Sequence, residues 1–140
     1  MGYAVRKADI KGSVFSVTAN AIVDTGSDTT IINSEIAREL ESDGVGNLIL
    51  VGPQGEPITG WYTFASLRIL NTPYSARKKI VVVNKMTFQP DVLIGNDFLM
   101  YQKQISGKPS LEINCDKCGS PIDTCPCTWL PFKVPPQLQV

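Results

Sequence analysis

The sequence contains no histidine, and this absence removes several catalytic mechanisms at once. Ser-His-Asp and Cys-His sites need an imidazole as their general base, and HExxH zinc hydrolases need two histidine ligands. The signatures GxxxxGK[ST] and GxGxxG are also missing, so nothing supports a P-loop or Rossmann nucleotide site. If the chain is an enzyme, carboxylates are the leading candidates for its acid–base chemistry.

Long apolar runs and an excess of charge are missing too. No run approaches the roughly 20 residues that span a bilayer, and the N-terminus lacks the apolar core of a signal peptide, so we expect a cytoplasmic protein without a membrane partner. The formal net charge is zero, which argues against a nucleic-acid partner. The chain has 140 residues, 43% of them hydrophobic, which suits one domain with a core.

Most of the sequence has the pattern of β-strands. Apolar or β-branched runs predict strands at residues 14–17, 21–23, 29–32, 79–83 and 109–115. Two apolar arms flank a Gly/Pro tip, which predicts a long hairpin over residues 48–64, and a second hairpin is expected around residues 71–75. Ser34 is expected to cap a short helix, and another short helix is expected to begin near Asn96.

The stretch NAIVDTGSDTTIIN, residues 20–33, places the carboxylate of Asp24 at the end of an apolar strand. Asp-Thr-Gly alone is a weak signal, because Asp and Gly are ordinary turn residues. Its setting adds weight: Ser27 comes next, followed by a β-branched strand and a short helix. About 70 residues later, the apolar run 92–94 and Gly95 again lead into a short helix.

This order of elements resembles the retropepsin family of aspartic proteases, the single-domain proteases of retroviruses and related elements. The resemblance covers roughly residues 14–114, and IGNDFL looks more like plant pararetrovirus members than animal retrovirus ones. The resemblance implies an all-β fold, a closed β-barrel of the acid-protease type with one or two short helices. If the protein is viral, the resemblance implies a location in the host cytoplasm or the virion. We therefore divide the chain into a protease domain, 1–114, and a Cys- and Pro-rich C-terminal appendage, 115–140.

Aspartic proteolysis needs two carboxylates that share one proton, because like charges about 3 Å apart cannot both ionise. Water then attacks the peptide carbonyl directly, so histidine is not required. The chain carries Asp-Thr-Gly only once, and one copy cannot make the pair. We therefore expect a twofold homodimer in which each chain contributes Asp24, as the resemblance also implies.

The resemblance assigns roles to the neighbours of Asp24. The Thr25 hydroxyl would hydrogen-bond across the pair to the partner's backbone, with a plain turn threonine as the alternative. Gly26 would let the loop backbone approach the other Asp24 and the substrate. Ser27 would donate a hydrogen bond to the Asp24 carboxylate and favour its charged form.

Asp28 and Gly95 follow the family pattern with one departure. Many retroviral members place an Arg after this glycine to pair with the residue at Asp28, but Asn96 and Asp97 stand there. Asp28 is therefore expected to lose that partner. Gly95 would let its strand pack tightly behind the Asp24 loop, or serve as a helix-start glycine, and both roles are compatible.

The hairpin over residues 48–64 would be a flap that closes over an extended peptide, with an ordinary surface hairpin as the alternative. An apolar cleft is expected to be lined by Ile22, Ile31, Ile32, Val51 and Ile94. The substrate-binding candidates are Ser27, Asp28, Gly52, Pro53, Gln54, Gly55 and Ile94, beside the catalytic candidates Asp24, Thr25 and Gly26.

All four cysteines, Cys115, Cys118, Cys125 and Cys127, lie in the stretch CDKCGSPIDTCPC. C-x2-C-G is a good half-site for zinc, whereas C-x-C is a less usual second half. A structural zinc site and four free structural cysteines are the two alternatives. Catalysis itself is expected to need no cofactor.

The preferred function is an aspartic endopeptidase that cuts extended polypeptide segments, in polyprotein processing, and prefers apolar residues near the cut. Its partners would be a second copy of the chain and the polypeptide substrate. The alternatives are a non-catalytic dimerisation module with the same fold and a zinc-binding tail module.

Overall fold

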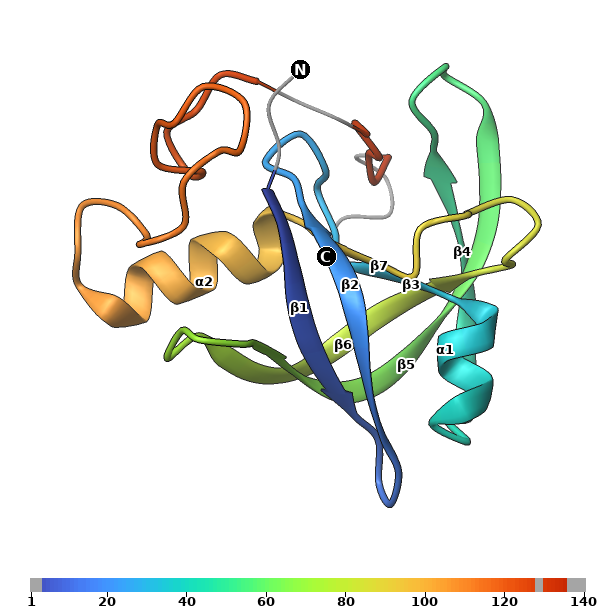
Figure 1. The fold of residues 1–140 in the computed structure, drawn as a ribbon. Coiled ribbons are helices and arrows are strands. Elements are labelled where there is room, and N and C mark those ends of the chain that lie inside the picture. The colour runs from blue at the N-terminus through green and yellow to red at the C-terminus, as the bar shows by residue number, and fades with distance from the viewer. Residues whose placement is uncertain (1–3, 128–129, 136–140) are drawn as a thin grey trace.

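The computed structural model describes residues 4–127 and 130–135, which form a mostly β structure (Figure 1). The strands are β1 (Ala4–Lys11), β2 (Ser16–Val23), β3 (Ile31–Asn33), β4 (Val45–Val51), β5 (Pro57–Ile69), β6 (Ser75–Val83) and β7 (Val92–Ile94). The helices are α1 (Ser34–Glu39) and α2 (Asn96–Ser106). No helix in this part of the chain is long and apolar enough to cross a membrane.

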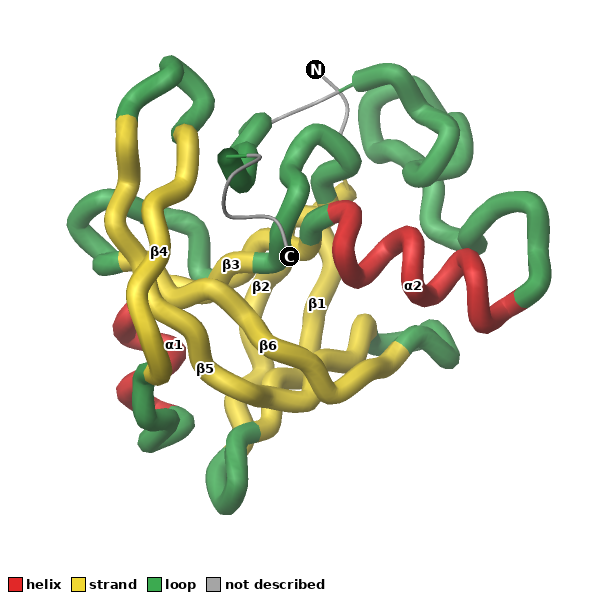
Figure 2. Tube along the Cα trace, turned by 180° about the vertical axis from the view of Figure 1, so that it is seen from behind, coloured by secondary structure: helices red, strands yellow, loops and turns green. Residues whose placement is uncertain are grey.

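The strands close into a barrel. Their order is β1-β2-β7-β3-β6-β5-β4, and an additional antiparallel pairing of β1 with β5 joins six of them in a ring. The remaining strand, β4, extends outward as a hairpin with β5 (Figure 2). Closure pairs the edges that an open sheet would expose. The prediction of an all-β closed barrel with short helices is confirmed.

Two apolar clusters lie on opposite faces of the central strands. Neighbouring residues alternate between them, with Ile32, Val82 and Ile94 in the barrel core and Ile31, Val81 and Leu93 in the second cluster. The alternation follows from the two-residue period of a β-strand. Strands β3 and β7 are buried on both faces, which explains why consecutive residues are apolar in Ile31-Ile32 of β3 and throughout β7.

Both expected hairpins are present. Strands β4 and β5 flank a tip in which the amide of Gly52 donates to the carbonyl of Glu56, at 2.8 Å. Gly55 in this tip has φ of +80°, a left-handed conformation that favours glycine. The second hairpin joins β5 to β6.

Several local predictions were wrong. The N-cap of α1 is Asn33 rather than Ser34, because Asn33 has the extended backbone of a cap and its side chain accepts from the amides of Glu35 and Ile36, at 2.9 and 3.2 Å. Residues 109–115 form no strand and contribute only an isolated bridge between Asn114 and Pro121. Strand β1 was missed, because charged residues interrupt its apolar positions.

Candidate active site

The Asp24 loop, residues 24–30, begins where two parallel strands end. Strand β2 pairs with β7 up to Val23 and Ile94, and the amide of Asp24 continues the ladder by donating to the carbonyl of Ile94, at 2.9 Å. Asp24 is fully buried. Its Oδ1 accepts a hydrogen bond from the amide of Gly26, at 2.7 Å, which partly offsets the cost of burying a carboxylate. The loop thereby fixes the carboxylate at the end of the strand pair.

The start of α2 holds this loop from behind. The side chain of Asn96 donates to the carbonyl of Thr25, at 2.6 Å, and the amide of Asn96 donates to the carbonyl of Ser27, at 2.8 Å. Both bonds fix loop carbonyls, so Asn96 positions the backbone on either side of Gly26. The sequence analysis missed this role, although the amide side chain of an Asn at a helix start can donate to the backbone carbonyls of a neighbouring turn.

Gly95 packs tightly behind the loop, as predicted. A Cβ at this position would lie 2.3 Å from the carbonyl oxygen of Thr29 and 2.9 Å from that of Ser27. Gly95 is also the N-cap of α2, so both interpretations of this glycine hold. Any side chain here would push the loop away from β7.

Replacing Gly95 by alanine is expected to destabilise the fold by about 3 kcal/mol, because the added methyl overlaps backbone atoms that cannot rotate away. Gly46→Ala is the matched control: nothing lies within 4 Å of its added Cβ, and only its φ of +71° is unfavourable, which costs about 1–2 kcal/mol. Urea unfolding monitored by circular dichroism measures both losses. Equal losses would show that Gly95 is not a close-approach site.

A second set of polar contacts holds the C-terminal end of the Asp24 loop. The Thr30 hydroxyl donates to Oδ1 of Asp97, at 2.8 Å, and accepts from the amide of Gly95, at 3.2 Å. Asp97 also forms an ion pair with Lys78 on β6. Asp97 therefore connects the loop, α2 and β6.

Two side chains in the loop differ from expectation. The Ser27 hydroxyl donates to the carbonyl of Thr29, at 2.8 Å, rather than to the Asp24 carboxylate. Its one proton is satisfied within the turn, two residues away. The Thr25 hydroxyl donates to the carbonyl of Cys127 in the same chain, at 3.4 Å, so its contact across a dimer stays a prediction.

Asp28 has partners that the sequence analysis did not anticipate. Its amide donates to the carbonyl of Phe132, at 2.8 Å, and its Oδ2 accepts from the amide of Val134, at 3.0 Å. The ammonium group of Lys133 lies 3.4 Å from its Oδ1. The C-terminal segment thus supplies the cationic partner that Asn96 and Asp97 do not provide.

The described C-terminal segment, residues 130–135, lies between the β4–β5 hairpin and the Asp24 loop (Figures 1 and 2). Val51 and Lys133 form an antiparallel bridge in which each amide donates to the other carbonyl, at 2.8 and 2.9 Å. On the opposite side, the amide of Leu130 donates to Oδ2 of Asp24. The segment therefore contacts the hairpin and the buried carboxylate together.

The second apolar cluster forms the floor beneath this segment. Phe132 is only 4% exposed and meets Phe88 edge to face, with ring centroids 5.4 Å apart. An adjacent cavity of about 440 Å³ is lined by Pro53, Gln54, Ile58, Phe88, Leu130 and Phe132. Of the expected tip residues, Pro53 and Gln54 face the cavity, whereas Gly52 and Gly55 form the turn itself.

The predicted cleft residues divide by strand register. Ile31 belongs to the same cluster as Phe132, and Val51 contacts Lys133 through its backbone. Ile32 and Ile94 instead lie in the barrel core, so Leu93, not Ile94, faces the segment side. A shift of one residue along a strand moves a side chain to the opposite face.

Residues 10–101, which include the Asp24 loop, the hairpin and Gly95, match the family described as "gag-polyprotein putative aspartyl protease". The chain belongs to this aspartyl protease family. The resemblance to retropepsin-like proteases is therefore confirmed. Among solved structures, EIAV protease complexed with the inhibitor HBY-793 is similar, with a TM-score of 0.49 and 16% identity over 78% of this chain and 93% of that chain. No curated protein matches the chain.

The cysteine cluster lies outside the residues that match the protease family. The sulfur atoms of Cys115, Cys118, Cys125 and Cys127 all lie within 4.8 Å of one another. The amides of Lys117 and Cys127 point at the sulfurs of Cys115 and Cys125, each at 3.4 Å. The predicted grouping of these four residues is thus present, at a separation suited to a metal ion.

Two of these thiols are in hydrogen-bond contact. The sulfurs of Cys118 and Cys125 are 3.1 Å apart. This contact lowers the pKa of Cys118 to about 6, and the same contact together with burial raises the pKa of Cys125 to about 12. The contact thus favours the thiolate form of Cys118, which is the form of cysteine that binds metals.

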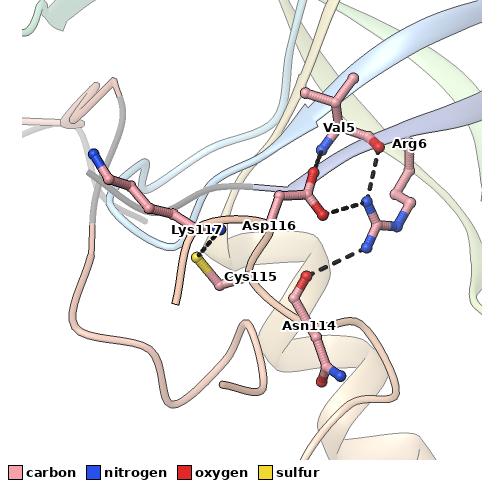
Figure 3. A network of polar contacts seen from close by, with 6 residues as sticks. All are labelled: Val5, Arg6, Asn114, Cys115, Asp116 and Lys117. Carbon is pink, nitrogen blue, oxygen red and sulfur yellow. Dashed lines mark hydrogen bonds and ion pairs between the residues drawn. The ribbon is translucent and has the colours of Figure 1, made fainter. Parts of the chain in front are cut away.

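Asp116 links the cysteine loop, residues 115–127, to β1 through hydrogen bonds and an ion pair (Figure 3). Its carboxylate accepts from the amide of Val5 and from the guanidinium of Arg6, each at 2.8 Å, and Arg6 also donates to the carbonyl of Asn114, at 3.3 Å. Burial raises the pKa of Asp116, but the bonds from Val5 and Arg6 outweigh it and the net pKa is lowered. The loop is thus held to the barrel by a charged side chain.

Part of the predicted C-terminal appendage is buried in the barrel core. Cys115, Ile122 and Cys125 are buried in the same apolar cluster as the strands, together with Ile113. The polar contacts of Asp116 and this apolar packing join residues 113–125 to the barrel from two sides.

Proposed function

We propose that the protein is an aspartic endopeptidase in which each chain of a homodimer contributes one Asp24. The observation that carries the proposal is the buried Asp24 carboxylate, which contacts a segment that also pairs with the β4–β5 hairpin through Val51, in a member of an aspartyl protease family. The hairpin acts as the flap. The substrate is an extended polypeptide, and the family's gag-polyprotein description supports polyprotein processing.

The chemistry follows from two such carboxylates sharing one proton. The ionised carboxylate takes a proton from water as the water attacks the peptide carbonyl, and the protonated one hydrogen-bonds the carbonyl oxygen. Gly26 holds Asp24 through its amide, and Asn96 holds the loop carbonyls. The amides of Asp28 and Val51 bind the peptide backbone, as they bind residues of the chain itself here.

Because the site needs two chains, cleavage is expected to depend on dimerisation. The rate per chain should fall as the protein is diluted, in parallel with the dimer fraction measured by analytical ultracentrifugation. A statine-type transition-state mimic should inhibit the reaction. A rate per chain that stays constant while the mass is monomeric would contradict the proposal. Residues 130–134 contact Asp24 and would have to move for a substrate to bind. A dimer that cleaves no peptide even when these residues are displaced would favour the non-catalytic dimerisation module.

We propose further that the four cysteines bind one structural zinc ion. Sulfurs held tetrahedrally by zinc at about 2.3 Å lie about 3.8 Å apart, which agrees with the observed grouping within 4.8 Å. The amides of Lys117 and Cys127 would stabilise the thiolates. Four thiolates fill the coordination sphere, so this ion would stabilise the fold and take no part in catalysis.

A further inference from the structure

We propose that residues 130–134 compete with substrate by occupying the peptide groove of their own chain, with Phe132 as the anchor. The groove is the surface between Val51 of the hairpin and Asp28 of the Asp24 loop, both of which pair with the segment. The expected effect on cleavage rests on the proposed peptidase function. The occupation of the groove by the segment can be tested by peptide binding alone. The segment would hold the protease in an inhibited state until it leaves the groove.

The backbone of the segment uses the groups that any extended ligand would need. The amide and carbonyl of Val51 both pair with Lys133, and the amide of Asp28 pairs with the carbonyl of Phe132. Peptides that add a strand bind mainly through such backbone bonds. A substrate must therefore displace the segment to reach these groups.

The segment occupies the carboxylate that substrate would need. Oδ2 of Asp24 accepts from the amide of Leu130. A segment bound within one chain meets a single Asp24, and cleavage needs two carboxylates that share a proton. The segment therefore blocks Asp24 in a chain that has not yet formed the complete site.

The same stretch also engages the threonine that was expected to face a dimer partner. The Thr25 hydroxyl donates to the carbonyl of Cys127, just before the segment. The Thr25 hydroxyl has one proton, so it cannot donate a full hydrogen bond to Cys127 and to a dimer partner at the same time. Occupancy of the groove thus competes with a dimer contact as well as with substrate.

Phe132 supplies the specificity of the contact. It is 4% exposed, packs against Phe88, and shares its cluster with Ile31, Leu50 and Leu93. The ammonium group of Lys133 adds a solvent-screened pairing with Asp28. The pocket therefore accepts an aromatic side chain followed by a basic one.

A short tether makes this competition effective. Two residues separate Cys127 from Leu130, and Cys125 is packed in the barrel core. Short linkers give effective concentrations on the order of millimolar. A segment of modest affinity then fills the groove in most molecules, and it raises the apparent KM by about tenfold or more.

The test compares the full-length protein with Phe132→Asp, which places a charge in the aromatic pocket. At a protein concentration that keeps both proteins dimeric, KM for a peptide substrate is expected to fall by about tenfold with little change in kcat, because only competition with the substrate is then removed. Phe15→Asp is the matched control, since Phe15 is exposed in the β1–β2 loop. It should leave KM unchanged. A KM for Phe132→Asp equal to that of the wild type would overturn the proposal.

Two further measurements do not need catalysis. Hydrogen exchange at the amides of Val51 and Asp28 should be faster in Phe132→Asp, whereas exchange in β6 should not change. A fluorescent peptide with the sequence of residues 130–135 should bind the variant about tenfold more tightly than the wild type. Equal exchange and equal binding would overturn the proposal. Faster exchange and tighter binding without cleavage would support the occupied groove and reject the peptidase function.

Discussion

Asp24→Asn is expected to lower kcat for peptide cleavage by at least about 10³-fold. The amide cannot take a proton from water or share one with a second carboxylate. The fold should survive, because the Asn oxygen can still accept from the amide of Gly26, which now lies 2.7 Å from Oδ1. The measurement is steady-state cleavage of a peptide at mildly acidic pH, with dimerisation checked at the same concentration.

The contact of Asp24 with Leu130 means that the Asp24→Asn experiment needs a second background. An Asn Nδ2 would face the amide of Leu130, so two donors would meet and the C-terminal segment would bind less well. The substitution is therefore also made in the Phe132→Asp background, where the segment no longer contributes. Asp43→Asn, in an exposed loop, is the control and should retain full activity. Cleavage that persists in both Asp24→Asn proteins would end the proposed mechanism.

Removal of zinc is expected to lower the melting temperature by about 10 °C or more. Structural zinc contributes on the order of 10 kcal/mol in small domains, and even a loss of about 3 kcal/mol shifts the melting temperature by roughly 10 °C in a domain of this size. Residues 109–127 contribute an isolated bridge and no strand. Cys115 and Cys125 are buried with Ile113 and Ile122, so loss of the ion would disturb the barrel core.

The measurement is a thermal melt with and without a chelator, beside the metal content of the purified protein. One zinc per chain is expected. Cys118→Ser should melt near the temperature of the chelated wild type, and the chelator should cause no further fall in this variant. A metal-free protein whose melting temperature is indifferent to chelator and to Cys118→Ser would leave four free cysteines as the correct interpretation.

The sequence predicted the parts of the site that depend on local chemistry. Asp24 follows an apolar strand and precedes Gly26, and the tip of the hairpin needs Gly55 at positive φ. The close approach at Gly95 was also predictable, because only a missing side chain permits it. The family resemblance extended these local patterns to a closed barrel, and the structure and the family match agree with it.

Predictions that depended on a choice between nearby polar partners were less successful. Ser27 was assigned to Asp24 but bonds to Thr29, and Ser34 was assigned a cap that Asn33 provides. In each case two candidate groups lie within a few residues. Backbone geometry, which the sequence pattern does not specify at that precision, decides between them.

The sequence by itself determined that the chain carries one Asp-Thr-Gly, four closely spaced cysteines, no histidine and several apolar or β-branched runs typical of strands. Only the tertiary structure decided that Leu93 and not Ile94 faces the groove, and that Leu130 reaches Asp24 across 106 positions of sequence. Periodicity assigns a residue to a strand but not to a partner. Partners so far apart meet because the closed barrel and the packed cysteine loop bring them together, and that geometry is a property of the whole chain.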